Sequence, residues 1–194
     1  MDNTLIGQYL NPKTKANYNI PLLKSYAGYP VVSAQELGLM DYFKNDGVNV
    51  GGMAWGGKTN PPGQGGGEAP SIVPNPYMFK NNAIGQNALV KLEASRHWMY
   101  ENNYTPEFKI TPEMQKWREE QFKDIGPAGE GYLKNDNLLK QTIISRIIGG
   151  DENVPLISND VKKEAFAIRN KLEELDKKSK PTISDNVMSA IKLK

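Results

Sequence analysis

The sequence contains no cysteine and a single histidine, His97, among its 194 residues. The lack of cysteine excludes disulfides, cysteine-ligated zinc, iron–sulfur clusters and thiol catalysis. One imidazole leaves almost no basis for histidine metal sites or Ser-His catalysis. No apolar run approaches the roughly 18 residues that a membrane span needs, and residues 1–10 lack the basic and apolar regions of a secretory signal. We therefore expect no metal, no cofactor and no membrane partner, and a cytoplasmic location unless the chain belongs to a virion.

Net charge is also small, because 24 Lys and Arg are balanced by 22 Asp and Glu, which leaves +2. A chain with so little excess positive charge makes few phosphate contacts, so nucleic acid is not expected as its principal partner. The lysines at 177, 178 and 180 keep a nucleic-acid-binding regulatory protein open as an alternative. Lysines at the C-terminal end of a helix also complement the helix dipole, which explains them without a ligand.

Charge and glycine divide the chain into two halves near residue 80. Residues 1–80 carry 11 charged residues and residues 81–194 carry 35, whereas 12 of the 18 Gly and 8 of the 13 Pro lie in the first 80 residues. Nine glycines between Gly47 and Gly67 disfavour any regular element there. The predicted fold class is mainly α: a small irregular domain of about four to five helices, with a long extended Gly- and Pro-rich arm and little regular sheet.

The expected organisation follows from this division. Ser33 and Glu36 have the spacing of a capping box, which predicts a short helix. The predicted segments are an extended Tyr- and Pro-rich arm at 1–32, the short helix at 33–46, a Gly- and Pro-rich irregular segment at 47–80, a helical domain at 81–180 and a tail helix at 181–194.

Apolar residues at helical spacing predict the helices of the second half. The stripes predict helices at about 82–101, 112–125, 135–149 and 158–178, with Ile84 on the buried face of the first and Gly126-Pro127 ending the second. In the last of them, Val161, Ile168 and Leu175 lie at the spacing of a short coiled-coil seam. Packing within the same domain and packing on another chain both explain this seam.

The first 32 residues contain Tyr9-Leu-Asn-Pro12 and Tyr18-Asn-Ile-Pro21, which is either a short repeat or a coincidence in a Tyr- and Pro-rich segment. Prolines at this spacing favour an extended backbone. An extended segment with aromatic side chains and little charge needs a surface to lie on, which is either the C-terminal half or another chain. The candidate partner contacts are Tyr9, Pro12, Tyr18, Pro21, Tyr26, Tyr29, Trp55, Tyr77, Val161, Ile168, Leu172 and Leu175.

The sequence from Gly52 to Thr59 fits the phosphate-loop pattern G-x-x-x-x-G-K-T, in which backbone amides hold phosphates, Lys58 neutralises charge and Thr59 binds magnesium. Such a loop must lead into a helix, whose N-terminus supplies much of the anion binding. The following Asn-Pro-Pro-Gly-Gln-Gly-Gly-Gly cannot be helical. We therefore reject Gly52, Gly57, Lys58 and Thr59 as a cofactor site.

His97 lies between Glu93 and Glu101 at helical spacing, so one helix face presents two carboxylates and an imidazole. A metal site needs three or four ligands, and no second histidine is present to complete the usual sets. A solvated ion-pairing face is the expected structure. No pair of carboxylates is placed for catalysis.

These observations favour a non-enzymatic structural subunit of a large assembly over an enzyme. The 20 Lys against 4 Arg, together with 19 Asn, are typical of an AT-rich genome, as in many phages of AT-rich hosts. We expect a virus or tailed-phage particle, in which the extended arm binds neighbouring protein subunits in several copies. The alternatives are a nucleotide-binding or small enzymatic accessory protein that uses the Gly52–Thr59 loop, and the nucleic-acid-binding regulatory protein.

Overall fold

The computed structural model describes residues 21–45, 50–57, 70–79, 82–123, 127–151, 154 and 157–179. Within these residues the fold is mainly helical, with six helices and two small antiparallel sheets of two strands each. The fold class predicted from the sequence is therefore confirmed. The arm at residues 1–20, residues 47–49, 58–69 and 80 of the Gly- and Pro-rich segment, and the tail at 181–194 lie outside the described residues.

The described N-terminal residues contain both sheets and one short helix. Strands β1 (Ser25–Tyr26) and β2 (Tyr29–Pro30) form a tight hairpin, and helix α2 spans Met40–Asn45. Strand β3 (Gly52–Trp55) pairs antiparallel with β4 (Ser71–Pro74), with Gly52 opposite Pro74. The two sheets are linked where Val32 donates to the Ile72 carbonyl at 2.9 Å.

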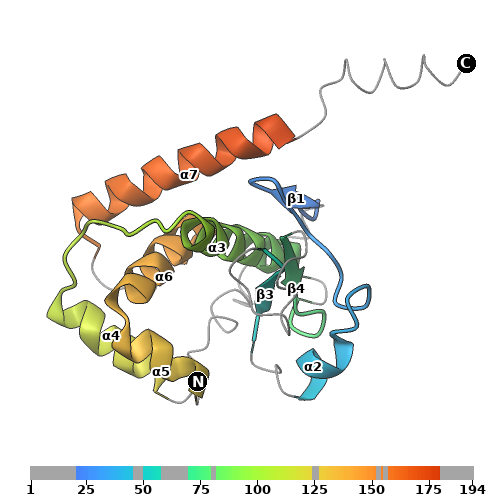
Figure 1. Ribbon diagram of the computed structural model, residues 1–194, viewed down its shortest axis with the longest axis horizontal. Helices are drawn as coiled ribbons and strands as arrows, with labels where there is room; N and C mark the ends of the chain where they lie inside the picture. The colour runs from blue at the N-terminus through green and yellow to red at the C-terminus, as the bar shows by residue number, and fades with distance from the viewer. Residues whose placement is uncertain are drawn as a thin grey trace, which may run out of the picture.

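Among the described residues after β4 there are five helices: α3 (Ala83–Glu101), α4 (Pro112–Phe122), α5 (Pro127–Lys134), α6 (Asp136–Gly149) and α7 (Asn159–Ser179). Helix α3 packs against α6, α7 and both sheets. It therefore occupies the centre of the fold. Figure 1 shows α7 lying across one side of α3 and α6, with β3 and β4 at the start of α3. No described helix is both long and apolar enough to cross a membrane.

The main hydrophobic core is formed where α3, α6 and α7 meet. Met99, Leu139, Ile143, Ile144 and Leu172 are completely or almost completely buried in it. Burying a side chain of this size stabilises the fold by about 1.5–3 kcal/mol relative to leaving it exposed. A second, smaller cluster holds α2 and the β3–β4 sheet together around three buried residues, Ala34, Phe43 and Val73.

Local capping explains why the helix bounds were predictable. Thr111 accepts a hydrogen bond from the Met114 amide, and Asn135 accepts one from the Leu138 amide, so both helices begin at capped residues. Gly150 ends α6 in the left-handed conformation at φ 86°, which glycine adopts without strain. The helices predicted at 82–101, 135–149 and 158–178 match α3, α6 and α7 to within about one residue.

Two local predictions are wrong, and one helix was missed. The Ser33–Glu36 capping box forms its hydrogen bonds, but the helix begins only at Met40, because Gly38 turns the chain at φ 68°. Helix α4 ends at Phe122, before Gly126-Pro127 as expected, but a helix that was not predicted, α5, begins at Pro127. Proline fits the first turn of a helix. The segment predicted to be irregular, 47–80, contains the β3–β4 sheet.

Candidate functional site

The described end of the N-terminal segment is bound to α3 by the side chain of Asn87. The Asn87 Nδ2 donates to the carbonyl oxygen of Pro21 at 2.9 Å, and its Oδ1 accepts from the amide of Leu23 at 2.8 Å. One carboxamide thus pairs with two backbone groups of an extended chain, as a neighbouring strand would do. We call this pair of hydrogen bonds the Asn87 clamp. Both partners are backbone atoms, so these two hydrogen bonds do not depend on the identity of the side chains at residues 21–23.

The β1–β2 hairpin then inserts two tyrosines into the main core. Its turn residues, Ala27 and Gly28, have φ of 55° and 85°, the left-handed conformation that two-residue hairpin turns require. Tyr26 and Tyr29 are 4% and 9% exposed. Burial raises the pKa of both phenols to about 12, with Glu173 adding to the shift at Tyr26 and Glu101 at Tyr29. The hairpin is therefore anchored by aromatic side chains between α3 and α7.

Several candidate partner contacts are buried within this chain. Tyr26 and Tyr29 are covered by α3 and α7, so they are not exposed anchors, and that prediction is wrong for them. The stripe on α7 faces the main core, so the heptad seam packs within the chain. The residues so removed from the partner-contact set are Tyr26, Tyr29, Val161, Ile168 and Leu172.

The remaining candidates differ in exposure. Tyr77 is 52% exposed and Pro21 is also exposed. Trp55 and Leu175 are half-buried, Trp55 against the second cluster and Leu175 against the main core. Tyr9, Pro12 and Tyr18 lie outside the described residues.

The phosphate-loop pattern lies partly in a strand. Gly52–Trp55 is extended and paired with β4, whereas a phosphate loop curves these residues around its ligand. A Cβ atom at Gly52 would lie 2.5 Å from Leu89 Cδ2 and 2.8 Å from the Val73 carbonyl oxygen. Glycine at position 52 is therefore required by the close approach of β3 to β4 and α3. Lys58 and Thr59 lie outside the described residues.

His97 is buried, and the prediction of a solvated face for this residue is wrong. Its side chain is 2% exposed, and Nε2 lies 3.7 Å from Glu101 Oε1. The Tyr29 ring contacts the imidazole edge-on, with ring centroids 5.2 Å apart. Gly57, at φ 92°, closes the pocket: a Cβ atom there would lie 2.9 Å from His97 Nε2 and 2.5 Å from Glu101 Oε1. We call these four residues the His97 cluster.

The electrostatics of the His97 cluster favour a neutral imidazole. Burial lowers the pKa of His97; Glu101 opposes this shift and Arg96 adds to it. Nε2 has no hydrogen-bond partner in the described part of the chain. A buried polar atom without a partner costs free energy, so His97 is held by packing and not by a satisfied polar network.

Glu93 is also buried, because the sheets, α6 and α7 cover α3 on most sides. It forms an ion pair with Arg96 at 2.5 Å, and Arg96 also donates to the Tyr132 hydroxyl at 3.0 Å. Burial raises the pKa of Glu93. Among the described residues, no three His, Asp or Glu side chains gather in a geometry that could hold a metal ion.

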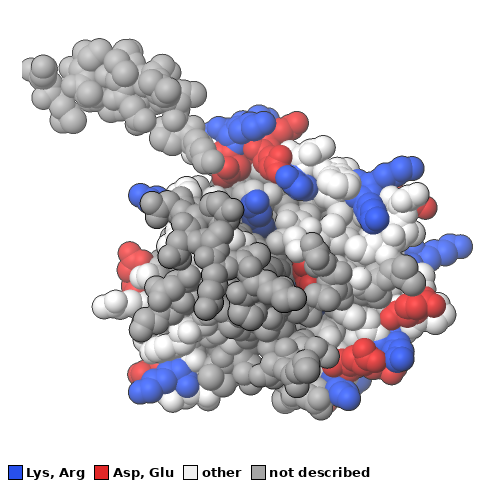
Figure 2. Space-filling view, turned by 180° about the vertical axis from the view of Figure 1, so that it is seen from behind, with Lys and Arg blue, Asp and Glu red and all other residues white. Residues whose placement is uncertain are grey.

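A shallow, open hollow of about 640 Å³ lies between α5 and α6. Its charged side chains are engaged in ion pairs: Glu130 with Lys134 at 2.9 Å, and Asp136 with Arg118 at 2.8 Å. The hollow therefore offers surface ion pairs and not a carboxylate pair aimed at a substrate. In the view of Figure 2, basic and acidic side chains alternate around the edge of the molecule.

Sequence reasoning missed Asn87 and the exposure of two aliphatic residues. Ile84, placed on the buried stripe, is 48% exposed, and Leu22 is 50% exposed. The only sequence signal for Asn87 is a carboxamide in the uncharged first turns of α3, which does not by itself indicate a backbone contact 64 residues away.

Comparisons with known proteins add no relative from which a function could be transferred. No protein-family model matches the sequence, and neither the curated proteins nor the solved structures include a match.

Proposed function

We propose that this chain is a non-enzymatic structural subunit of a large assembly, of the kind found in virus or tailed-phage particles, and that its N-terminal segment binds neighbouring subunits. The observation that carries the proposal is how residues 21–32 are bound. They lie as an extended segment and a small hairpin on α3, α7 and β4, held by backbone hydrogen bonds and buried tyrosines.

Such contacts can form whether or not the segment and the surface belong to the same chain. The Asn87 clamp reads only backbone, and Val32 donates to the backbone of Ile72 in β4. Backbone pairing and aromatic anchors are the means by which extended segments bind other chains. This supports an extended arm as the binding element of the subunit.

The residues before Pro21 share the low charge and the tyrosines of the bound segment. Residues 1–20 contain only three charged residues and carry Tyr9, Pro12 and Tyr18. A segment of this composition cannot bury its apolar side chains within itself and gains stability on a surface. The 20 Lys, 4 Arg and 19 Asn of the whole chain are typical of an AT-rich genome, as in many phages of AT-rich hosts, which is compatible with the virion location that we propose.

The test is the association state of the full chain, measured by sedimentation velocity over about 1–100 µM and by electron microscopy of the same samples. We expect species larger than the monomer whose proportion rises with concentration. Deletion of residues 1–20 should return the protein to a monomer without loss of helical circular dichroism. A full chain that stays monomeric at every concentration, or associates equally without residues 1–20, would contradict the proposal.

A further inference from the structure

Exposed apolar side chains gather at the start of α3. Five large hydrophobic residues of the described chain are strongly exposed, and three of them, Leu22, Tyr77 and Ile84, lie around the first turns of this helix. Ile84 is in the first turn, Tyr77 is on the turn that leads into it, and Leu22 lies between the two residues held by the Asn87 clamp. We call these three residues the α3 apolar surface.

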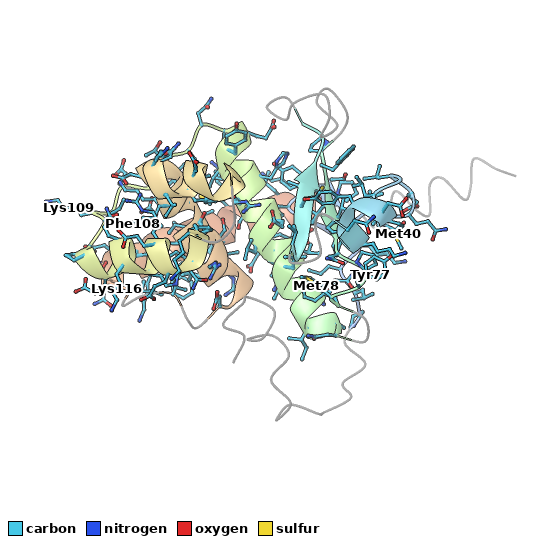
Figure 3. The ribbon with its side chains drawn as sticks, turned by 90° about the horizontal axis from the view of Figure 1, so that it is seen from below. Met40, Tyr77, Met78, Phe108, Lys109 and Lys116 are labelled. Atoms are coloured by element: carbon cyan, nitrogen blue, oxygen red, sulfur yellow. The ribbon has the colours of Figure 1, made fainter. Side chains whose placement is uncertain are left out.

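Few charged residues lie near these three residues in the sequence, the nearest being Lys24 and Lys80. Residues 21–23, 70–79 and 82–90 contain no Asp, Glu, Lys or Arg. Figure 3 shows Tyr77 and Met78 at the end of the molecule formed by α2 and the start of α3, opposite Lys109 and Lys116. Protein interfaces are depleted in charge and enriched in aromatic and Met side chains. The surface therefore has the chemistry of a protein contact.

The Asn87 clamp shows which kind of chain this region binds. It already holds an extended, uncharged backbone at Pro21 and Leu23, beside Leu22 and one turn from Ile84. A second extended and uncharged segment is therefore the kind of ligand that we expect along these apolar side chains. Residues 1–20 are such a segment, with Tyr9 and Tyr18 as aromatic anchors and only three charges.

The length of the N-terminal segment allows it to reach another copy. Residues 1–20 precede Pro21 and Leu23, which the Asn87 clamp holds at this surface. Because the proposed function assigns this segment to neighbouring subunits, a second copy is the partner we consider. Twenty extended residues reach about 60 Å, which is enough to arrive at a neighbouring molecule.

We propose that residues 1–20 of one copy dock on the α3 apolar surface of a second copy. This inference rests on the proposed function, and it names the partner and the surface. Because the arm and the surface are different parts of the chain, each copy both gives an arm and receives one, so the contact is heterologous and extends to rings or longer arrays.

The experiment uses the full chain with Tyr9→p-benzoylphenylalanine, a photo-crosslinking substitution, as a mixture of isotopically light and heavy protein. Mass spectrometry then separates crosslinks between copies, which join light to heavy, from crosslinks within one chain. We expect light–heavy crosslinks from position 9 to peptides that contain Leu22, Tyr77 or Ile84. The double variant Tyr77→Ser and Ile84→Ser should lower their yield by about fivefold or more.

Tyr100→Ser is the matched control, because Tyr100 is 48% exposed at the other end of α3. It should leave the yield unchanged. Crosslinks within one chain only, crosslinks to another surface, or equal losses in both variants would overturn the docking site. Sedimentation of the unsubstituted chain separates the two proposals: association with crosslinks elsewhere leaves the proposed function standing, whereas a monomer at every concentration overturns both.

Discussion

The helical part of the chain, residues 82–179, and the N-terminal part, residues 21–79, obtain their stability from different sources. In the helical part, Met99, Leu139 and Ile144 interlock between helices that cover one another. In the N-terminal part, two-stranded sheets of two and four residues per strand bury few side chains of their own. A two-stranded sheet is marginal in water without a surface to pack on. The low-charge part of this chain therefore depends on α3, which it covers.

Truncating a side chain in the helical core should cause the largest loss of stability, and it tests whether the N-terminal part depends on that core. Ile144→Ala removes methylene groups from a side chain that is fully buried between α3 and α6. The free energy of unfolding should fall by about 2–5 kcal/mol, measured by urea denaturation. Because the N-terminal part packs on α3, hydrogen exchange should accelerate in the sheets as well as in the helices. If the sheets keep their protection while α6 loses its own, the N-terminal part does not depend on the helical core.

A change in the N-terminal part should remain local. In Gly52→Ala the new Cβ meets the Val73 carbonyl and Leu89, so β3 must move away from β4 and α3. Overpacking of this kind costs about 1–3 kcal/mol. Hydrogen exchange should accelerate in β3 and β4, while α6 and α7 keep the protection of the original protein.

Gly131→Ala is the control for this substitution. A Cβ atom at Gly131 meets nothing within 4 Å, and the residue lies inside α5. Alanine there should stabilise the helix by up to about 1 kcal/mol. If both alanine variants were destabilised equally, the close approach of neighbouring atoms at Gly52 would not be the cause of the destabilisation in Gly52→Ala.

The parts of this fold that were predictable are those fixed by neighbouring residues. Thr111-Pro112 and Asn135 define helix starts through contacts three residues away, which a sequence displays. The β3–β4 sheet was missed because Gly52 pairs with Pro74 across a glycine-rich segment, and no local pattern specifies that partner. The burial of His97 was missed for the same reason, since Tyr29 and Gly57, which cover it, lie 68 and 40 residues before it.

The α3 apolar surface shows what helical periodicity in the sequence does not predict. Ile84 continues the apolar spacing of α3 and was expected to be buried, yet the described chain leaves it half exposed. Helical periodicity identifies a face, but how far along the helix that face is covered depends on where the other elements end. Asn87 carries even less signal, because its partners are backbone atoms of residues 21 and 23.

The smallest expected effect concerns the contact between the two parts at the His97 cluster. The folded state lowers the pKa of His97, so the unfolded state binds the proton more readily, and stability is lost as pH falls below about 6.5 toward the folded-state value. Protonation places a charge among Tyr29, Gly57, Glu101 and Arg96, of which only Glu101 favours it. The protection factors of β2 and of residues 52–57, which correct for the intrinsic pH dependence of amide exchange, should therefore fall between pH 7.5 and pH 5, a range that brackets the ordinary histidine pKa of about 6.5.

His97→Gln isolates this contribution, because glutamine has no charge to gain in that range. Buried Glu93, whose raised pKa acts in the opposite direction on acidification, is present in both proteins, so it cancels in the difference between them. The variant should keep its protection factors at low pH, whereas Glu101→Gln should enlarge the loss of protection by removing the one carboxylate that favours the imidazolium. An unchanged pH profile in His97→Gln would show that the contact between the N-terminal part and α3 does not depend on a neutral His97.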